Sequence, residues 1–386
     1  MLIANLAVVL IVLVCIAYQY QKGRLVNSFA TLMSIIFAGI AAFAYFEPLS
    51  EVFIARGGNA RFPALVPWAQ VLCFSLLFVL VFAVLQTGVQ QLTRKHVDLG
   101  KPADQIGRVV CGFFMGLMGS GLLLTALMMA PLPNKYPYAR FDATRADPGK
   151  PNKPLLNADG FAVGLFGLVS RGSLSGERSF STLHPDFQSQ LSLNRIAAGK
   201  EITAVATSEA IVLPKKTEGQ EQAVAAWPAP ADLKTSQDKS VPQRSGHDLI
   251  VVRAGFLKNS LKDTGRFTLS QLRVVCKPSN SAQAALAGKG QNAYPVGYFK
   301  SADEVEMAGL RKEIKLIGSD FEEGESIKWI DFLFYVPSGF EPVLLEFKQN
   351  IVLQVPPLVS ADQAPAAAAA LKERVTKKTD KDSPDD

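Results

Sequence analysis

The sequence predicts four transmembrane helices followed by a mainly β soluble domain. Long apolar segments dominate the first third of the chain, and short runs of β-branched and aromatic residues dominate the end. The apolar segments are Leu2–Tyr18, Leu25–Phe46, Ala64–Leu85 and Val109–Ala130, and none has Lys, Arg, Asp or Glu in its middle. Each approaches the length of about 20 residues that a helix needs to cross a bilayer. The lipid bilayer is therefore the first expected partner.

The charged residues are distributed differently in the two parts. Up to Ala130 there are eight Lys and Arg against four Asp and Glu, whereas the remainder has 32 against 30. The soluble part is nearly balanced and has no run of like charge, so no nucleic-acid partner is expected.

The short connections predict the orientation. The first connection carries Lys22 and Arg24 without an acid, and the third carries Arg94, Lys95, Lys101 and Arg108. Because Lys and Arg are retained in the cytoplasm, both connections should be cytoplasmic. The amino terminus and the soluble domain should then lie outside.

Two helices carry small residues at one-turn spacing. The predicted packing residues are Ala30, Ser34, Ala38 and Ala42 in the second segment, and Gly112, Gly116 and Ser120 in the fourth. We expect both stripes to face other helices, and they could face each other. Alternatively, Gly and Ala are simply frequent in membrane helices. Asn27 and Gln70 could line a path through the membrane, but helix–helix hydrogen bonds are the favoured use. The lack of ionisable groups within the four apolar segments argues against secondary transport.

This order of features resembles the CvpA (colicin V production protein) family. The matching residues are Lys22-Gly23 in the first turn and Gly112-x-x-x-Gly116 in the fourth helix, within about residues 1–130. The chain lacks the intact Asp-Arg pair that often precedes this ladder in the family, since Gly107-Arg108 stands there with Asp104 further back. Asn27 lies where an acidic residue usually follows the first turn.

The resemblance implies a multi-pass accessory protein of the bacterial inner membrane, and with the orientation predicted from the loop charges its carboxy-terminal domain would be periplasmic. It links the chain to colicin V production or export, a toxin biosynthetic process, and to envelope maintenance. It implies no defined reaction. Some relatives carry a periplasmic serine-protease domain after the four helices.

The soluble part divides by composition. The predicted organisation is a transmembrane domain over 1–133, a linker over 134–157, a membrane-proximal segment over 158–214, a flexible linker over 215–246, a β domain over 247–357 and a disordered tail over 358–386. The apolar run Phe161–Val169 is too short to cross, and could be a core helix or a helix at the membrane surface. The stretch Pro214–His247 has few large apolar residues, with Trp227 its only anchor.

The β domain is predicted from seven short runs. They are Leu249–Phe256, Phe267–Cys276, Tyr294–Phe299, Ile314–Ile317, Trp329–Val336, Val343–Phe347 and Ile351–Val355. Polar turns separate them, which favours an antiparallel β-sandwich. The aromatic run Trp329–Tyr335 could expose a ligand face, but its alternation favours core packing. Asp331 is the exception, and suits a turn or a strand edge.

Motifs for chemistry are weak. Ser173 or Ser175 with His184 and Asp186 is the only candidate hydrolase cluster, and Gly172–Gly176 does not match Gly-x-Ser-x-Gly because Leu174 is central. No metal, cofactor or catalytic residue is assigned, since paired Cys and His motifs are lacking. The predicted role is therefore a non-enzymatic accessory protein, with an envelope protein as the possible partner. An oligomeric channel or export component is the alternative, and a membrane-tethered hydrolase a third.

Overall fold

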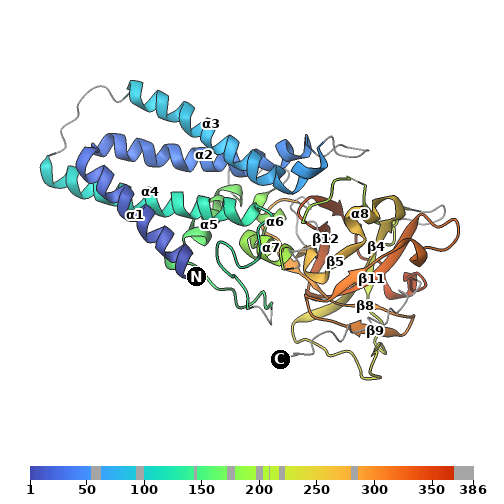
Figure 1. The fold of residues 1–386 in the computed structure, drawn as a ribbon. Helices are drawn as coiled ribbons and strands as arrows, with labels where there is room; N and C mark the ends of the chain where they lie inside the picture. The colour runs from blue at the N-terminus through green and yellow to red at the C-terminus, as the bar shows by residue number, and fades with distance from the viewer. Residues whose placement is uncertain are drawn as a thin grey trace, which may run out of the picture.

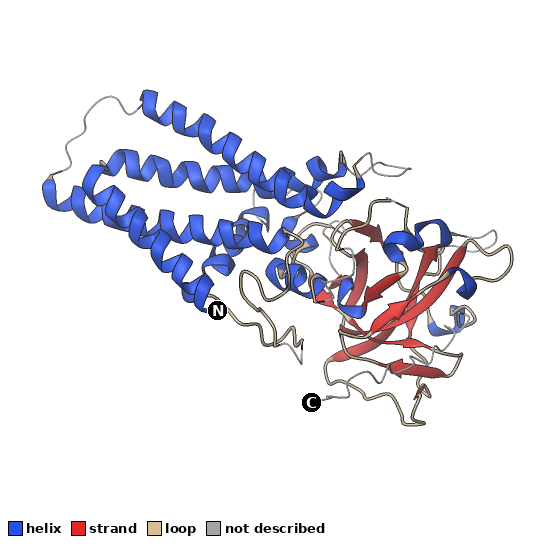
Figure 2. Ribbon diagram, in the orientation of Figure 1, coloured by secondary structure: helices blue, strands red, loops and turns tan. Residues whose placement is uncertain are grey.

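The computed structural model describes residues 1–53, 62–92, 100–142, 146–171, 179–196, 203–207, 209–216, 222–279 and 286–368. A helical bundle forms one part of the molecule, and a sheet-rich domain lies at one end of it (Figure 1). Figure 2 shows that the strands gather in that domain, while the bundle is purely helical.

Four helices of the bundle are long and apolar enough to cross a membrane. They are α1 (Leu2–Lys22), α2 (Leu25–Glu51), α3 (Val66–Leu92), which follows the 3-10 turn η1 (Pro63–Leu65), and α4 (Lys101–Met129). The four predicted helices are thus confirmed. The neighbours α1 and α2 are joined by a two-residue hairpin, but α1 packs mainly on α4 and α2 mainly on α3.

Glycine allows α1 and α4 to approach closely. A Cβ placed on Gly112 would lie 2.9 Å from the Cα of Ile16, and one on Gly116 would lie 2.5 Å from the Cα of Val12. These neighbours are backbone atoms and cannot rotate away. Close contact of this kind holds helices together in lipid, where burying apolar side chains gains little.

Three shorter helices follow α4 in the chain; the first packs on the bundle, and the other two lie between the bundle and the sheets. They are α5 (Ala158–Arg171), preceded by the turn η2 (Leu155–Asn157), α6 (Phe180–Leu183) and α7 (Phe187–Asn194). Helix α5 packs inside the bundle: the carbonyl of Ala158 lies over Gly121 of α4, and the ring of Phe166 lies over Gly39 of α2. Its opposite face, with Phe161 and Leu168, is exposed. The predicted run Phe161–Val169 therefore lies in a helix that buries one face in the core and exposes the other.

The domain contains strands in three sheets. They are β1 (Ile211–Val212), β2 (Ala226–Pro228), β3 (Lys234–Thr235), β4 (His247–Leu257), β5 (Arg266–Thr268), β6 (Leu272–Pro278), β7 (Gln291–Ala293), β8 (Pro295–Phe299), β9 (Glu304–Met307), β10 (Glu313–Lys315), β11 (Ile327–Pro337), β12 (Phe340–Phe347) and β13 (Ile351–Gln354). The largest sheet has the order β1-β4-β11-β8-β9-β3, with β2 also on β4. A second sheet has the order β13-β12-β6-β7, and β10 pairs with β5. Every described strand pair is antiparallel except β3 with β9.

The two larger sheets contribute to one core. Val252 and Phe256 of β4 and Phe332 and Phe334 of β11 are fully buried in the same cluster as Leu345 of β12. The intervening residues of β4 and β11 point to the opposite face, because side chains alternate along a strand. That face has its own cluster around Trp227, Val251, Leu333 and Val359.

The expected flexible linker over 215–246 contains ordered strands in its described part. Trp227 in β2 is only 4% exposed and lies opposite Val251 of β4. Leu233 of the same stretch is buried in the same cluster, and Val224, Ala229 and Val241 pack against it. The expected disordered tail is also ordered at its start, where the Val359 amide donates to the Ala226 carbonyl (3.1 Å). Residues 217–221 and 369–386 fall outside the described ranges.

Candidate functional site

A polar pair joins the bundle to the helical segment that precedes the sheets; His184 is buried in it and Glu47 is half-buried. His184 follows α6, and its Nε2 lies 2.7 Å from Oε1 of Glu47 on α2. Its Nδ1 lies 2.9 Å from Oε1 of Gln190 on α7. Both ring nitrogens therefore face acceptor oxygens, and a doubly protonated imidazolium satisfies both.

The surroundings of His184 determine its charge. Its ring packs between Phe180 and Phe187, with ring centroids 4.9 and 4.8 Å away. Burial alone lowers the pKa of His184, but the Glu47 carboxylate and its hydrogen bond raise it, and the net pKa is above the ordinary value. Glu47, near the end of α2, therefore favours the protonated form of the buried His184 ring.

A second buried ion pair lies behind His184. Arg273 on β6 forms a two-pronged contact with Glu346 on β12, including Nε to Oε1 at 3.1 Å. The same guanidinium donates to the Leu183 carbonyl at 2.7 Å and to Oδ1 of Asn292 at 2.7 Å. Burial raises the pKa of Glu346 above its ordinary value, although Arg273 opposes the shift. Arg273 therefore fixes the residue that precedes His184 to the four-stranded sheet.

Helix α3 makes its own contact with the domain. Nε2 of Gln70 donates to the carbonyl of Gln349, in the turn between β12 and β13, at 3.0 Å. The sequence-based expectation that Gln70 bonds another helix is therefore wrong, because its side chain reaches the domain. A small cavity of about 10 Å³ lies between these groups, lined by Glu47, Gln70, His184, Phe187, Gln190, Leu191, Asn194, Glu346 and Gln349. Its size matches about one water molecule.

The end of α4 is held by Arg195, which follows α7. Its guanidinium donates to the carbonyls of Leu127 (3.4 Å), Ala130 (3.3 Å) and Tyr136 (2.9 Å). Arg195 is 0% exposed. The last carbonyls of a helix have no partner within it, and a cation there also favours the helix dipole. Arg195 therefore closes α4 with a side chain from the end of α7.

A related network joins α5, α7 and the segment after α4. Arg140 donates to Oγ of Ser189 (3.0 Å) and to the hydroxyl of Tyr138 (3.1 Å), and lies 3.6 Å from Asp159. Tyr138 in turn donates to Asp159, which is 0% exposed at the start of α5. Asp186 accepts from the backbone amide of Ser189 and caps α7. These contacts leave little freedom where the chain leaves the bundle.

The predicted packing residues differ in the helix that they face and in their burial. Gly112 and Gly116 lie against α1, so the α4 stripe does not face the α2 stripe. Ser120, Ser34, Ala38 and Ala42 are buried, whereas Ala30 is half-buried. Ser34 and Ser120 donate to carbonyls of their own helices, at Ala30 and Leu117.

The structure describes only His184 and Asp186 of the candidate hydrolase cluster. Ser173 and Ser175 lie outside the described residues, as does His96. His184 is bonded to Glu47 and Gln190, whereas Asp186 caps α7 and contacts Arg140. Within the same residues, no group of three or more His, Cys, Asp and Glu is placed to hold a metal ion.

Sequence reasoning missed the pairing at the junction. Glu47 and His184 are 137 residues apart, and Arg273 and Glu346 are 73 apart. The only local signals were a single acid directly after an apolar segment and a single His after a short apolar run. Neither specifies a partner, because no periodic pattern connects them.

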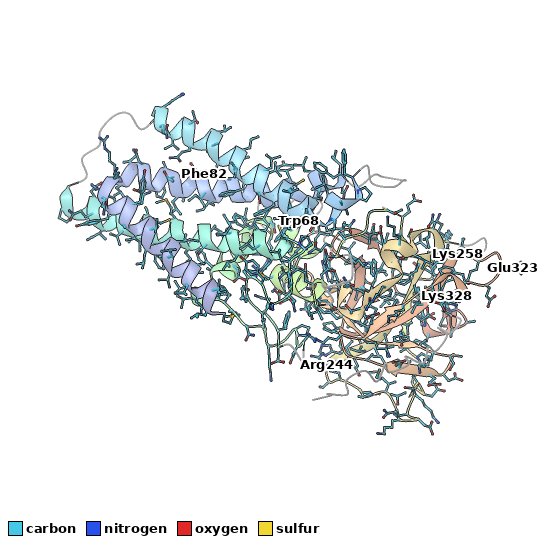
Figure 3. The ribbon with its side chains drawn as sticks, in the orientation of Figure 1. Trp68, Phe82, Arg244, Lys258, Glu323 and Lys328 are labelled. Atoms are coloured by element: carbon cyan, nitrogen blue, oxygen red, sulfur yellow. The ribbon has the colours of Figure 1, made fainter. Side chains whose placement is uncertain are left out.

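Comparison with known proteins found no matching family model, no matching curated protein and no matching solved structure. Figure 3 shows the contrast between the two parts of the chain: the labelled aromatic residues Trp68 and Phe82 lie on α3, and the labelled charged residues Lys258, Glu323 and Lys328 lie on the domain.

Proposed function

We propose that this protein is a multi-pass membrane protein of CvpA type that holds a β-sandwich domain rigidly at the outer face of the bacterial inner membrane. One observation carries the proposal: α2, α3 and α4 each make a polar contact with the chain that follows the bundle. Helix α3 contacts the domain itself, and α2 and α4 contact the α6–α7 segment, which Arg273 links to the four-stranded sheet. The contacts are made by Glu47, by Gln70 and by the carbonyls at the end of α4. A domain linked by a flexible tether would not need such contacts.

Exposed aromatic residues support the membrane placement. Tyr18 and Tyr20 are exposed near the hairpin end of α1, and Tyr45 and Trp68 are exposed near the domain end. Aromatic residues gather at the two interfaces of a bilayer. From Leu25 to Tyr45, α2 extends about 30 Å, which equals the thickness of the hydrocarbon core.

We place the domain in the periplasm because Lys22 and Arg24 lie at the opposite end of the bundle. The role that follows is accessory: the domain recognises an envelope component, and the helices fix its position. This fits the involvement in colicin V production or export and in envelope maintenance that the family resemblance implies. We assign no reaction, since the buried ionisable groups at the junction are used for attachment.

The alternative, an oligomeric channel or export component, needs helix faces that pack between copies. The Gly112 and Gly116 face is instead occupied by α1, and Gly121 is covered by α5. These contacts within one chain favour the accessory role over the channel.

Membrane fractionation and a topology reporter test the proposal. The full chain should stay in the membrane after carbonate washing, and an alkaline phosphatase fused after Pro133 should be active. Extraction by carbonate, or a fusion active only as a cytoplasmic reporter, would contradict it. Cross-linking in native membranes separates the two roles: an envelope partner supports the accessory role, and a ring of copies supports the channel.

A further inference from the structure

The outer face of the largest sheet carries a buried ion pair. Arg253 of β4 and Asp331 of β11 lie directly opposite each other on adjacent strands. The guanidinium contacts the carboxylate at two points, Nε to Oδ1 at 2.6 Å and Nη2 to Oδ2 at 2.7 Å. Asp331 is only 1% exposed, so it is neither in a turn nor on a strand edge as expected.

A segment of the same chain covers this pair and contacts it through backbone atoms. Nη2 of Arg253 donates to the carbonyl of Ala366 at 2.6 Å. The amide of Ala368 donates to Oδ2 of Asp331 at 2.9 Å. The ion pair thus offers a donor on Arg253 to one backbone carbonyl and an acceptor on Asp331 to the backbone amide two residues later. Recognition of this kind depends on an extended backbone and not on particular side chains.

The side chains of the segment show which residues fit. Ala364 and Ala367, three positions apart, pack against the cluster that contains Trp227, Val251 and Leu333. Ala364 has φ −60° and ψ 134°, close to a polyproline II conformation, and Pro365 follows it. That helix has three residues per turn, so every third side chain faces the sheet. The Trp227 ring borders the site, 5.3 Å from the Arg253 guanidinium carbon.

We infer that this face is a binding site for an extended, Ala- and Pro-rich peptide of a partner protein, and that residues 364–368 occupy it in the absence of that partner. The contacts to Arg253 and Asp331 use only backbone atoms, and the side-chain contacts accept small apolar groups. A partner segment of the same composition meets every requirement that the chain's own segment meets. The inference specifies what kind of partner the domain binds, and it therefore rests on the proposed accessory function.

Peptide binding to the full chain in nanodiscs tests this inference. The probe is a fluorescent peptide of residues 361–368, followed by fluorescence polarisation. In the variant Ala364→Asp with Ala367→Asp, two charges face the apolar cluster and release the chain's own segment. This variant should bind the probe at least about tenfold more tightly than the wild type, in which the attached segment competes at high effective concentration.

Altered probes keep the test independent of protein folding. A probe with Pro in place of Ala368 lacks the amide that reaches Asp331, and a probe with Asp in place of Ala367 places a charge on apolar residues. Both should bind at least about tenfold more weakly than the original probe. On the protein, Arg253→Gln should weaken binding similarly, whereas Arg266→Gln, which changes an ion pair elsewhere in the domain, should leave it unchanged.

The results distinguish this inference from the proposed function. If the released variant keeps its thermal midpoint but binds no probe, or if the altered probes bind equally well, the inference is wrong while the membrane placement stands. If wild-type chains cross-link through their tails and the probe separates them, the occupant is a second copy and not a partner protein.

Discussion

At the scale of single residues, Arg195 shows how a buried charge can join two parts of a protein. It lies after α7 and reaches three carbonyls at and beyond the end of α4, with no exposed surface. Leu127 lies in the last turn, where a helix leaves its carbonyls without an internal partner, and Ala130 and Tyr136 lie beyond the helix end. Removing Arg195 would leave buried acceptors unpaired, which costs more than the bonds themselves contribute.

We therefore expect Arg195→Gln to lower the free energy of unfolding by about 2–4 kcal/mol, because buried carbonyls lose their partner. Thermal unfolding of the detergent-solubilised protein measures the effect. The control is Arg266→Gln, which removes a partly exposed ion pair with Glu313. It should cost no more than about 1 kcal/mol. Equal effects of the two substitutions would show that Arg195 does not close α4.

At the scale of elements, the glycines of α4 provide a matched comparison. A Cβ on Gly116 would lie 2.5 Å from the Cα of Val12 in α1, whereas one on Gly119 would meet nothing within 4 Å. Gly116→Ala should therefore separate α1 from α4 and lower the SDS concentration at the unfolding midpoint. Gly119→Ala should leave that midpoint unchanged or raise it, because Ala favours a helix by up to about 1 kcal/mol over Gly. A harmless Gly116→Ala would contradict the close α1–α4 contact.

Helix α5 has an apolar outward face at the depth of the bundle. Ala158 lies over Gly121, eight residues before the end of α4, which is about 12 Å along that helix. Leu168 is 64% exposed. A helix that is apolar on both its packed and its open face fits lipid better than water. We expect the open face to contact acyl chains of the outer leaflet.

Spin labels on single cysteines check this placement, in a chain whose four native cysteines are replaced. A label at Leu168→Cys should be more accessible to oxygen than to a water-soluble nickel complex, as should a label at Leu80→Cys on α3. A label at Glu323→Cys on the domain should show the reverse. Nickel access at Leu168 but not at Leu80 would place α5 in water and leave the four long helices in lipid.

The sequence predicted the elements better than it predicted their contacts. An apolar segment of about 20 residues and an alternating strand are local patterns, so α1 to α4 and most long strands could be predicted directly. The short strand β2 could not, because a three-residue strand has no periodicity and Trp227 was its only signal. The Glu47–His184 pair could not be predicted either, because the fold brings together two residues without a common local pattern.

At the scale of the whole molecule, the junction should respond to pH. The pKa of His184 is raised in the folded protein, so its charged contact with Glu47 stabilises the structure below its ordinary pKa and loses effect as pH rises through the raised value. The raised pKa of Glu346 acts in the same direction. The thermal midpoint in nanodiscs should therefore fall as pH increases above about 6.5.

Glu47→Gln identifies the group responsible. The amide removes the charge that raises the pKa of His184, so the variant should show a smaller fall in midpoint over this pH range. His247→Gln changes a histidine at the start of β4, whose Nδ1 lies 3.0 Å from the carbonyl of the nearby Ser245, and it should behave like the wild type. If Glu47→Gln and the wild type lose stability in parallel, titration elsewhere controls the junction.

The pairing of α1 with α4 has a consequence for biosynthesis. Ribosomes make α1 first, yet its glycine-lined partner emerges about 90 residues later. Until then the Val12 and Ile16 side of α1 has no complement in the chain. The newly inserted α1 must be accommodated by surrounding lipid or by the insertion machinery, so this bundle closes only after its last long helix is complete.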